Sequence, residues 1–154
     1  MKNILLMHRS ILATVFLILL LNMPQQAFSQ KEPDSPAVLE IFQKYGSAKG
    51  VTLLEISKDL MKDYNISLFK SIIFENGYRF LPEIIEAIEK DKKDAKLIKE
   101  SKKDGLLNSG YYRLESIYKK NNRYLIFKIG SKNKVTLIYI EGELTSEQLI
   151  DLLK

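Results

Sequence analysis

The chain of 154 residues carries 24 basic and 19 acidic side chains, a formal net charge of +5, and no cysteine. Its single histidine, His8, lies near the N-terminus, so the rest of the chain has neither a thiol nor an imidazole. These absences exclude Ser-His-Asp and Cys-His catalysis, disulfides, and zinc sites built from Cys or His. The basic residues are too sparse for a nucleic-acid-binding stripe. We therefore expect no cofactor and no nucleic-acid partner.

An apolar run from Ile11 to Leu21 follows two basic residues, Lys2 and Arg9. A membrane-spanning helix needs about 20 apolar residues, so this run is too short to cross a bilayer. A basic start followed by a short apolar core is instead typical of a secretory signal peptide. We expect export to the periplasm or the cell surface. The alternative is an uncleaved N-terminal anchor, in which case the protein would contact the membrane only through this segment.

Small residues follow the apolar run at the spacing that signal peptidases require. Ala27 and Ser29 occupy the third and the last position before a cut that would leave Gln30 at the new N-terminus. This predicts residues 1–29 as signal peptide, 30–35 as a polar linker and 36–154 as a single α+β domain. Cleavage leaves about 125 residues, enough for a hydrophobic core that needs no disulfides.

The predicted domain begins with alternating helices and strands. The patterns predict, in order, a helix at 36–45, a strand at 50–57, one or two helical turns, a strand at 67–76 and a helix at 82–90. In the last of these, Glu83, Glu86 and Glu89 lie off the apolar stripe. We interpret them as a solvated helix face rather than a metal or acid–base site, because no other chemical group converges on them.

Residues 91–105 are compatible with two structures. The preceding helix could continue to a stop at Gly105. Alternatively, the segment could be a strand that turns back at Asp104-Gly105, a dipeptide favoured in tight hairpins. We favour the strand.

The last third of the chain predicts a three-stranded meander followed by a C-terminal helix. Asn121-Asn122 and Lys132-Asn133 are two-residue turn candidates, since Asn tolerates the positive φ that such turns need. Thr145 and Gln148 form a capping box at the start of the final helix. The expected fold is therefore α+β, with a mostly antiparallel sheet of five to six strands and with helices packed mainly on one face.

The two turns fix a register for the meander. The first turn places Ile117 opposite Ile126, and the second places Phe127 opposite Ile138. One face of the sheet then packs against helices, and the other carries an apolar band with a charged edge. This second face is the possible interaction surface: Arg113, Glu115, Ile117, Tyr124, Ile126, Lys128, Leu137 and Tyr139. The alternative is that a helix, such as 82–90, crosses this face and buries the band.

Two stretches carry a family resemblance: IFQKYGSAKGVTLLEISKDLM at 41–61 and VTLIYIEGELTSEQLIDLL at 135–153. They resemble a family of small exported proteins from Bacteroidetes-type bacteria, the domain of unknown function 4252 or a close relative of it. The likeness covers most of residues 38–153. It implies an exported α+β domain in an envelope context. That family has no assigned activity, so the resemblance implies no functional residue.

These observations favour a non-catalytic binding or interaction module of the bacterial envelope, whose partner is an envelope protein or a second copy of the chain. A second hypothesis is a carboxylate-dependent hydrolase acting on glycan or peptide in the periplasm, although no paired-acid signature is present. A third is an envelope signalling accessory that acts on a membrane protein, which differs from the first only in its partner.

Overall fold

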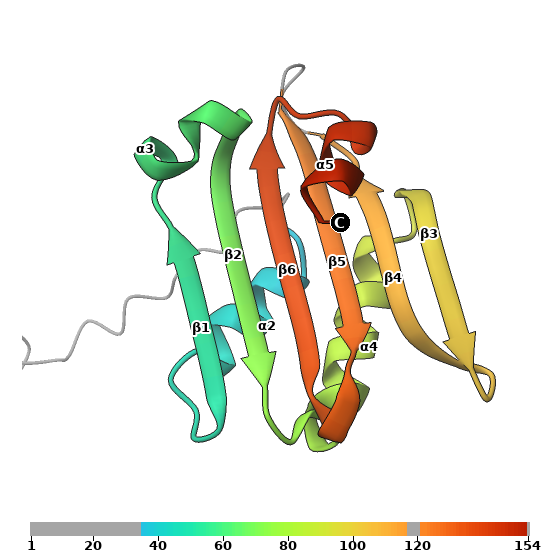
Figure 1. Cartoon of the computed structure of the whole chain (residues 1–154). Coiled ribbons are helices and arrows are strands. Elements are labelled where there is room, and N and C mark those ends of the chain that lie inside the picture. The colour runs from blue at the N-terminus through green and yellow to red at the C-terminus, as the bar shows by residue number, and fades with distance from the viewer. Residues whose placement is uncertain (1–34, 117–120, 154) are drawn as a thin grey trace, which may run out of the picture. The chain divides into compact units, whose positions relative to one another are not determined.

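The computed structural model describes residues 35–116 and 121–153, which form an α+β fold (Figure 1). The predicted signal peptide, most of the linker and Ile117 lie outside the described residues. Six antiparallel strands form one sheet in the order β1-β2-β6-β5-β4-β3. The strands are β1 (Val51–Ile56), β2 (Ile66–Phe74), β3 (Lys96–Lys103), β4 (Leu106–Leu114), β5 (Asn122–Ile129) and β6 (Val135–Gly142).

Helices lie on both faces of this sheet. They are α2 (Val38–Tyr45), α3 (Lys58–Met61), α4 (Leu81–Asp91) and α5 (Ser146–Leu152). In Figure 1, α2 and α4 lie behind the sheet, whereas α5 lies in front of it. The predicted α+β class, the C-terminal meander and the final helix are confirmed. The capping box is also confirmed, because the Thr145 side chain accepts from the Gln148 N–H and the Gln148 side chain accepts from the Thr145 N–H.

The main core lies between the sheet and the two helices behind it. In α4, Ile84, Ala87 and Ile88 are buried at the helical spacing that places them on one face. The buried side chains come from both helices and from four strands: Val38, Ile41, Phe42, Ile72, Phe74, Ile84, Ala87, Ile88, Tyr112, Leu114, Leu125, Phe127, Val135, Leu137 and Tyr139. Each large apolar side chain here contributes about 1.5–3 kcal/mol by leaving water.

A carboxylate from α4 caps the start of α2. The residue before α2, Ala37, has no side chain that can accept a hydrogen bond. Instead, the Asp91 oxygens accept from the Ala37 N–H at 2.6 Å and from the Val38 N–H at 2.9 Å. Two of the unsatisfied donors of the helix start are thus paired with a charge that the helix dipole favours. The contact fixes α2 beside α4 on the same face of the sheet.

The ambiguous segment after α4 is a strand, as favoured above. β3 and β4 form a hairpin in which Asp104 has φ 54° and Gly105 has φ 78°. Positive φ at both central residues is the geometry of a tight hairpin turn.

The predicted register between β4 and β5 is wrong. Ile126 pairs with Tyr111, not with Ile117. The chain does not turn at Asn121-Asn122, because Asn122 is the first residue of β5. Its side chain accepts from the Arg113 guanidinium and donates to the Leu144 carbonyl at 2.9 Å. These contacts hold Asn122 in the sheet, so the connection after β4 is longer than two residues.

The predicted register between β5 and β6 is wrong by one residue. Phe127 pairs with Leu137 rather than with Ile138. Lys132 and Asn133 do have positive φ, as predicted. The loop is longer than two residues, however: it runs from Gly130 to Lys134, and the Gly130 N–H donates to the Lys134 carbonyl at 2.8 Å. A shift of one residue turns every side chain of a strand to the opposite face. The faces predicted for β6 are therefore exchanged.

Candidate functional site

The face of the sheet opposite α2 and α4 is the candidate site, and we call it the open face. Strand pairing arranges its side chains in three cross-strand rows. Side chains of directly paired residues point to the same face, so each row is a continuous line of neighbours. The rows differ in polarity and in how far they are covered.

The covered row lies where β6 ends. It contains Ile56, Phe69, Ile140, Tyr124, Arg113 and Lys96. The chain after β6 packs on this row, because Leu144 and Leu149 join a buried cluster with Tyr124 and Ile140. The Tyr124 hydroxyl donates to the Leu144 carbonyl at 2.9 Å, so this buried polar group is satisfied. Figure 1 shows α5 in front of this part of the sheet.

The middle row is apolar at its centre and less completely covered. It contains Leu54, Ser71, Ile138, Ile126, Tyr111 and Lys99. Ile126 is only 4% exposed, but Ile138 and Tyr111 are half-buried and Leu54 is 49% exposed. The row therefore continues from the edge of the buried cluster out to the surface on both sides.

The outer row is mostly polar. It contains Thr52, Ile73, Thr136, Lys128, Ser109 and Ser101. The hydroxyl oxygens of Ser101 and Ser109 lie 2.7 Å apart, and Lys128 is exposed. Hydroxyl and ammonium groups are the residues expected on a sheet face that meets water. The open face thus changes from buried and apolar under α5 to polar and solvated at the outer row.

The predicted interaction surface is divided by the true register. Arg113, Tyr124, Ile126 and Lys128 share the open face, although Tyr124 is fully buried under α5. Leu137 and Tyr139 lie on the opposite face, fully buried in the main core. Glu115 follows β4 and is exposed. The prediction did not include several open-face residues, among them Leu54, Ile73, Tyr111 and Ile138. The alternation within the first two strands was the signal that could have identified Leu54 and Ile73.

The sequence matches a family of unknown function, DUF6108, over residues 25–153. The chain belongs to this family. The resemblance to the domain of unknown function 4252 is therefore corrected: it rested on a strand, a glycine and a capped helix, which many α+β domains contain. None of the curated proteins matches the sequence. Across residues 35–116 and 121–153, no helix is long and apolar enough to cross a membrane. The family assigns no activity to any residue of this DUF6108 member.

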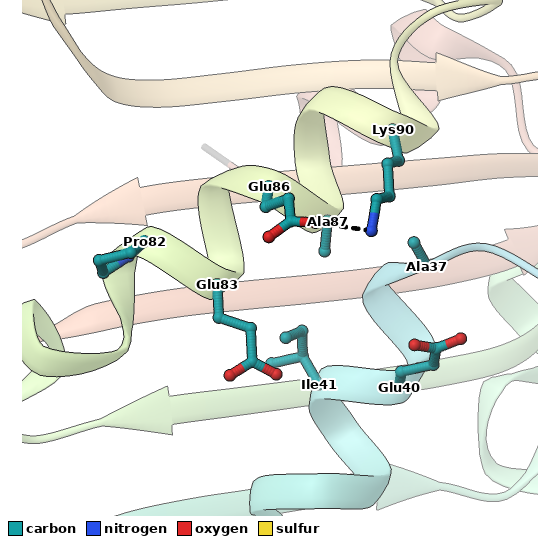
Figure 2. A pocket seen from close by; sticks show the side chains of 8 residues that line it. All are labelled: Ala37, Glu40, Ile41, Pro82, Glu83, Glu86, Ala87 and Lys90. Atoms are coloured by element: carbon teal, nitrogen blue, oxygen red, sulfur yellow. Dashed lines mark ion pairs between the residues drawn. The ribbon is translucent and has the colours of Figure 1, made fainter.

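Several carboxylates line the groove between α2 and α4, which makes this groove a candidate site for acid–base chemistry. It has a volume of about 470 Å³, and its lining includes Glu40, Glu83, Glu86 and Lys90 (Figure 2). Glu86 forms an ion pair with Lys90 at 2.8 Å. Glu83 accepts from the Lys44 ammonium at 2.7 Å and also from the Tyr45 hydroxyl.

These contacts favour a structural role for the groove. The hydrogen bond from Lys44, followed by that from Tyr45, lowers the pKa of Glu83. A general acid in a glycosidase needs a raised pKa, so Glu83 is poorly suited to donate a proton. No group of three or more His, Cys, Asp or Glu residues in the described part of the chain could hold a metal ion. The acidic groups on α4 instead link it to α2 and to its own next turn.

A second groove of about 890 Å³ lies between the start of α4 and the β3–β4 hairpin. Its lining is largely apolar, and Asp104 is the carboxylate among the lining residues that the structure describes. Hydrolysis by two carboxylates requires a facing pair, which this lining does not supply. Neither groove therefore favours the hydrolase hypothesis over binding.

Proposed function

We propose that this protein is an exported, non-catalytic interaction module of the bacterial envelope, and that it binds an envelope protein through the open face. The single observation that carries the proposal is the partly exposed apolar middle row. A sheet face left to water normally alternates to polar residues. Here Leu54, Ile138 and Tyr111 stay accessible beside the buried Ile126. Accessible apolar surface bordered by polar residues is typical of a protein interface.

The charge around the middle row indicates the kind of partner. Lys99 ends the row, Lys128 lies in the outer row, and Lys96 lies in the covered row, all of them exposed. These ammonium groups surround the end of the middle row that is nearer to β3. A partner that presents an apolar ridge with acidic residues along one flank would complement both features. The predicted signal peptide supports a site of binding in the periplasm or at the cell surface.

Two substitutions in β6 test the proposal. Ile138→Lys places an ammonium group in the middle row, whereas Thr136→Lys makes the same change in the outer row of the same strand. Each variant is expressed as the full chain, chemically crosslinked in intact cells and captured from the envelope. We expect Ile138→Lys to lose the crosslinked partner by at least about tenfold, equivalent to ~1.4 kcal/mol of binding. Thr136→Lys should retain it.

Partner capture can be compared only between folded variants, so the denaturation midpoint of each variant is measured in parallel. If Ile138→Lys unfolds, Leu54→Lys replaces it, because Leu54 lies in the same row and is far more exposed. Equal capture by a folded middle-row variant and by Thr136→Lys would contradict the proposal.

A further inference from the structure

The sheet has two edges, β1 and β3, and they are protected very differently. An edge strand presents unpaired N–H and C=O groups on which another strand can pair. β3 carries lysines at 96, 99, 102 and 103, and its register is interrupted twice, between Leu97 and Lys99 and between Ser101 and Lys102. Lysines and bulges are the usual means of blocking an edge. Edge pairing at β3 is therefore unfavourable.

β1 has none of these protections. Its sequence is VTLLEI, and it pairs with β2 over six consecutive residues without a bulge. Its one charged residue, Glu55, is paired with Lys70 at 2.7 Å. Leu53 is 37% exposed and Leu54 is exposed as well. A regular, apolar and accessible edge of this kind is a template for strand addition.

The free backbone groups of β1 can be identified. Glu75 donates its N–H to the Gly50 carbonyl, so Gly50 faces β2. Because the direction alternates along an antiparallel strand, Val51, Leu53 and Glu55 face outward. The Val51 N–H already donates to the Ala48 carbonyl at 3.1 Å. Within residues 35–116 and 121–153, the outward donors left for another strand are therefore the N–H groups of Leu53 and Glu55.

We infer that β1 pairs antiparallel with β1 of a second copy, with Leu53 opposite Leu53 of that copy. Each Leu53 N–H then donates to the other Leu53 carbonyl, and each Glu55 N–H donates to the Val51 carbonyl of the other copy. Every free outward donor then finds an acceptor. The Val51 N–H already donates to Ala48, so the Glu55 carbonyl that faces it stays open to water. Two-fold symmetry closes the assembly as a dimer.

The side chains are compatible with this pairing. Glu55 lies opposite Val51 of the second copy, and Leu54 lies opposite Thr52, so no like charges face each other. The two leucines at position 53 come together on the side of α2. A contact between two strands of six residues is small beside the roughly 1,200 Å² that a stable interface buries. The dimer is therefore weak, and it joins two sheets into one without covering the middle row of the open face.

The test uses protein purified from the envelope of cells expressing the full chain, with its mass measured by sedimentation equilibrium up to about 1 mM, where weak dimers form. We expect a dimer that both Leu53→Lys and Leu53→Glu convert to monomer, since like charges then face each other. Mixing these two variants should restore a dimer. Leu97→Lys, on the β3 edge, should remain dimeric. Melting curves establish that the variants are folded.

A second measurement does not depend on any variant. Hydrogen exchange of the unaltered protein should slow at the Leu53 and Glu55 amides as concentration rises, and stay constant along β3. A protein that is monomeric at the highest concentration would overturn the inference. So would a dimer that persists in both Leu53 variants or fails to re-form on mixing. Because Leu53 is on the α2 side, these results are independent of the open-face proposal.

Discussion

The docking of α5 on the open face can be tested by shortening one side chain. Leu149 is the buried residue of α5, 1% exposed within the cluster that contains Tyr124 and Ile140. Leu149→Ala removes about three methylene equivalents at ~0.8 kcal/mol each, or roughly 2.4 kcal/mol. Leu→Ala substitutions in cores cost about 2–5 kcal/mol. We expect about 2.5–3 kcal/mol, near the lower limit, because a terminal helix can settle into part of the space.

The assay is urea denaturation with an unchanged m value, so that a lower midpoint reports lower stability. Ile150→Ala is the matched control, since Ile150 lies next to Leu149 on α5 but is 39% exposed. It should cost less than about 1 kcal/mol. Hydrogen exchange should show that α5 loses protection in Leu149→Ala only. Equal costs for the two variants would refute the docking of α5 and the assignment of the covered row.

Three further predictions concern single groups. Tyr124→Phe should cost about 1 kcal/mol, because the Leu144 carbonyl loses one of its two donors and keeps only the Asn122 amide; a stability equal to that of the unaltered chain would contradict this. Burial, followed by hydrogen bonds to Glu100 and Glu141, raises the pKa of Tyr112 and Tyr139. The two tyrosines contribute fully to stability below their unfolded pKa of about 10, and this contribution falls as the pH rises above that value. Denaturation midpoints should therefore drop above about pH 10, and the drop should be smaller in Tyr139→Phe. N-terminal sequencing of exported protein should begin at Gln30 rather than in the apolar run.

Local signals predicted local structure well. The Asp104-Gly105 hairpin turn and the Thr145 capping box were both identified from adjacent residues, and both are confirmed. In each case the residues that determine the conformation lie within a few positions of one another. The order of helices and strands follows from the same kind of information, because periodicity is measured within a short window.

Register depended on contacts that the sequence does not place side by side. Asn122 was a reasonable turn residue, but Arg113 and Leu144 hold it in the sheet, and Leu144 lies far along the chain. The loop after β5 has an odd number of residues, which exchanged the faces of Leu137 and Ile138. The capping of α2 by Asp91 likewise has no local signal. The β4–β5 register is wrong by an even number of residues, so Arg113 stays on the predicted face. The β5–β6 register is wrong by one residue, which moves Leu137 and Tyr139 to the opposite face.

The most direct test of the central claim places a photo-crosslinking amino acid at position 138 of the full chain, in the middle row, and irradiates intact cells. A matched control carries it at position 106, an exposed leucine on the β3–β4 hairpin. If the open face is the partner site, position 138 should give one discrete protein adduct and position 106 should give none. Adducts of the same protein from both positions, or from position 106 alone, would contradict it.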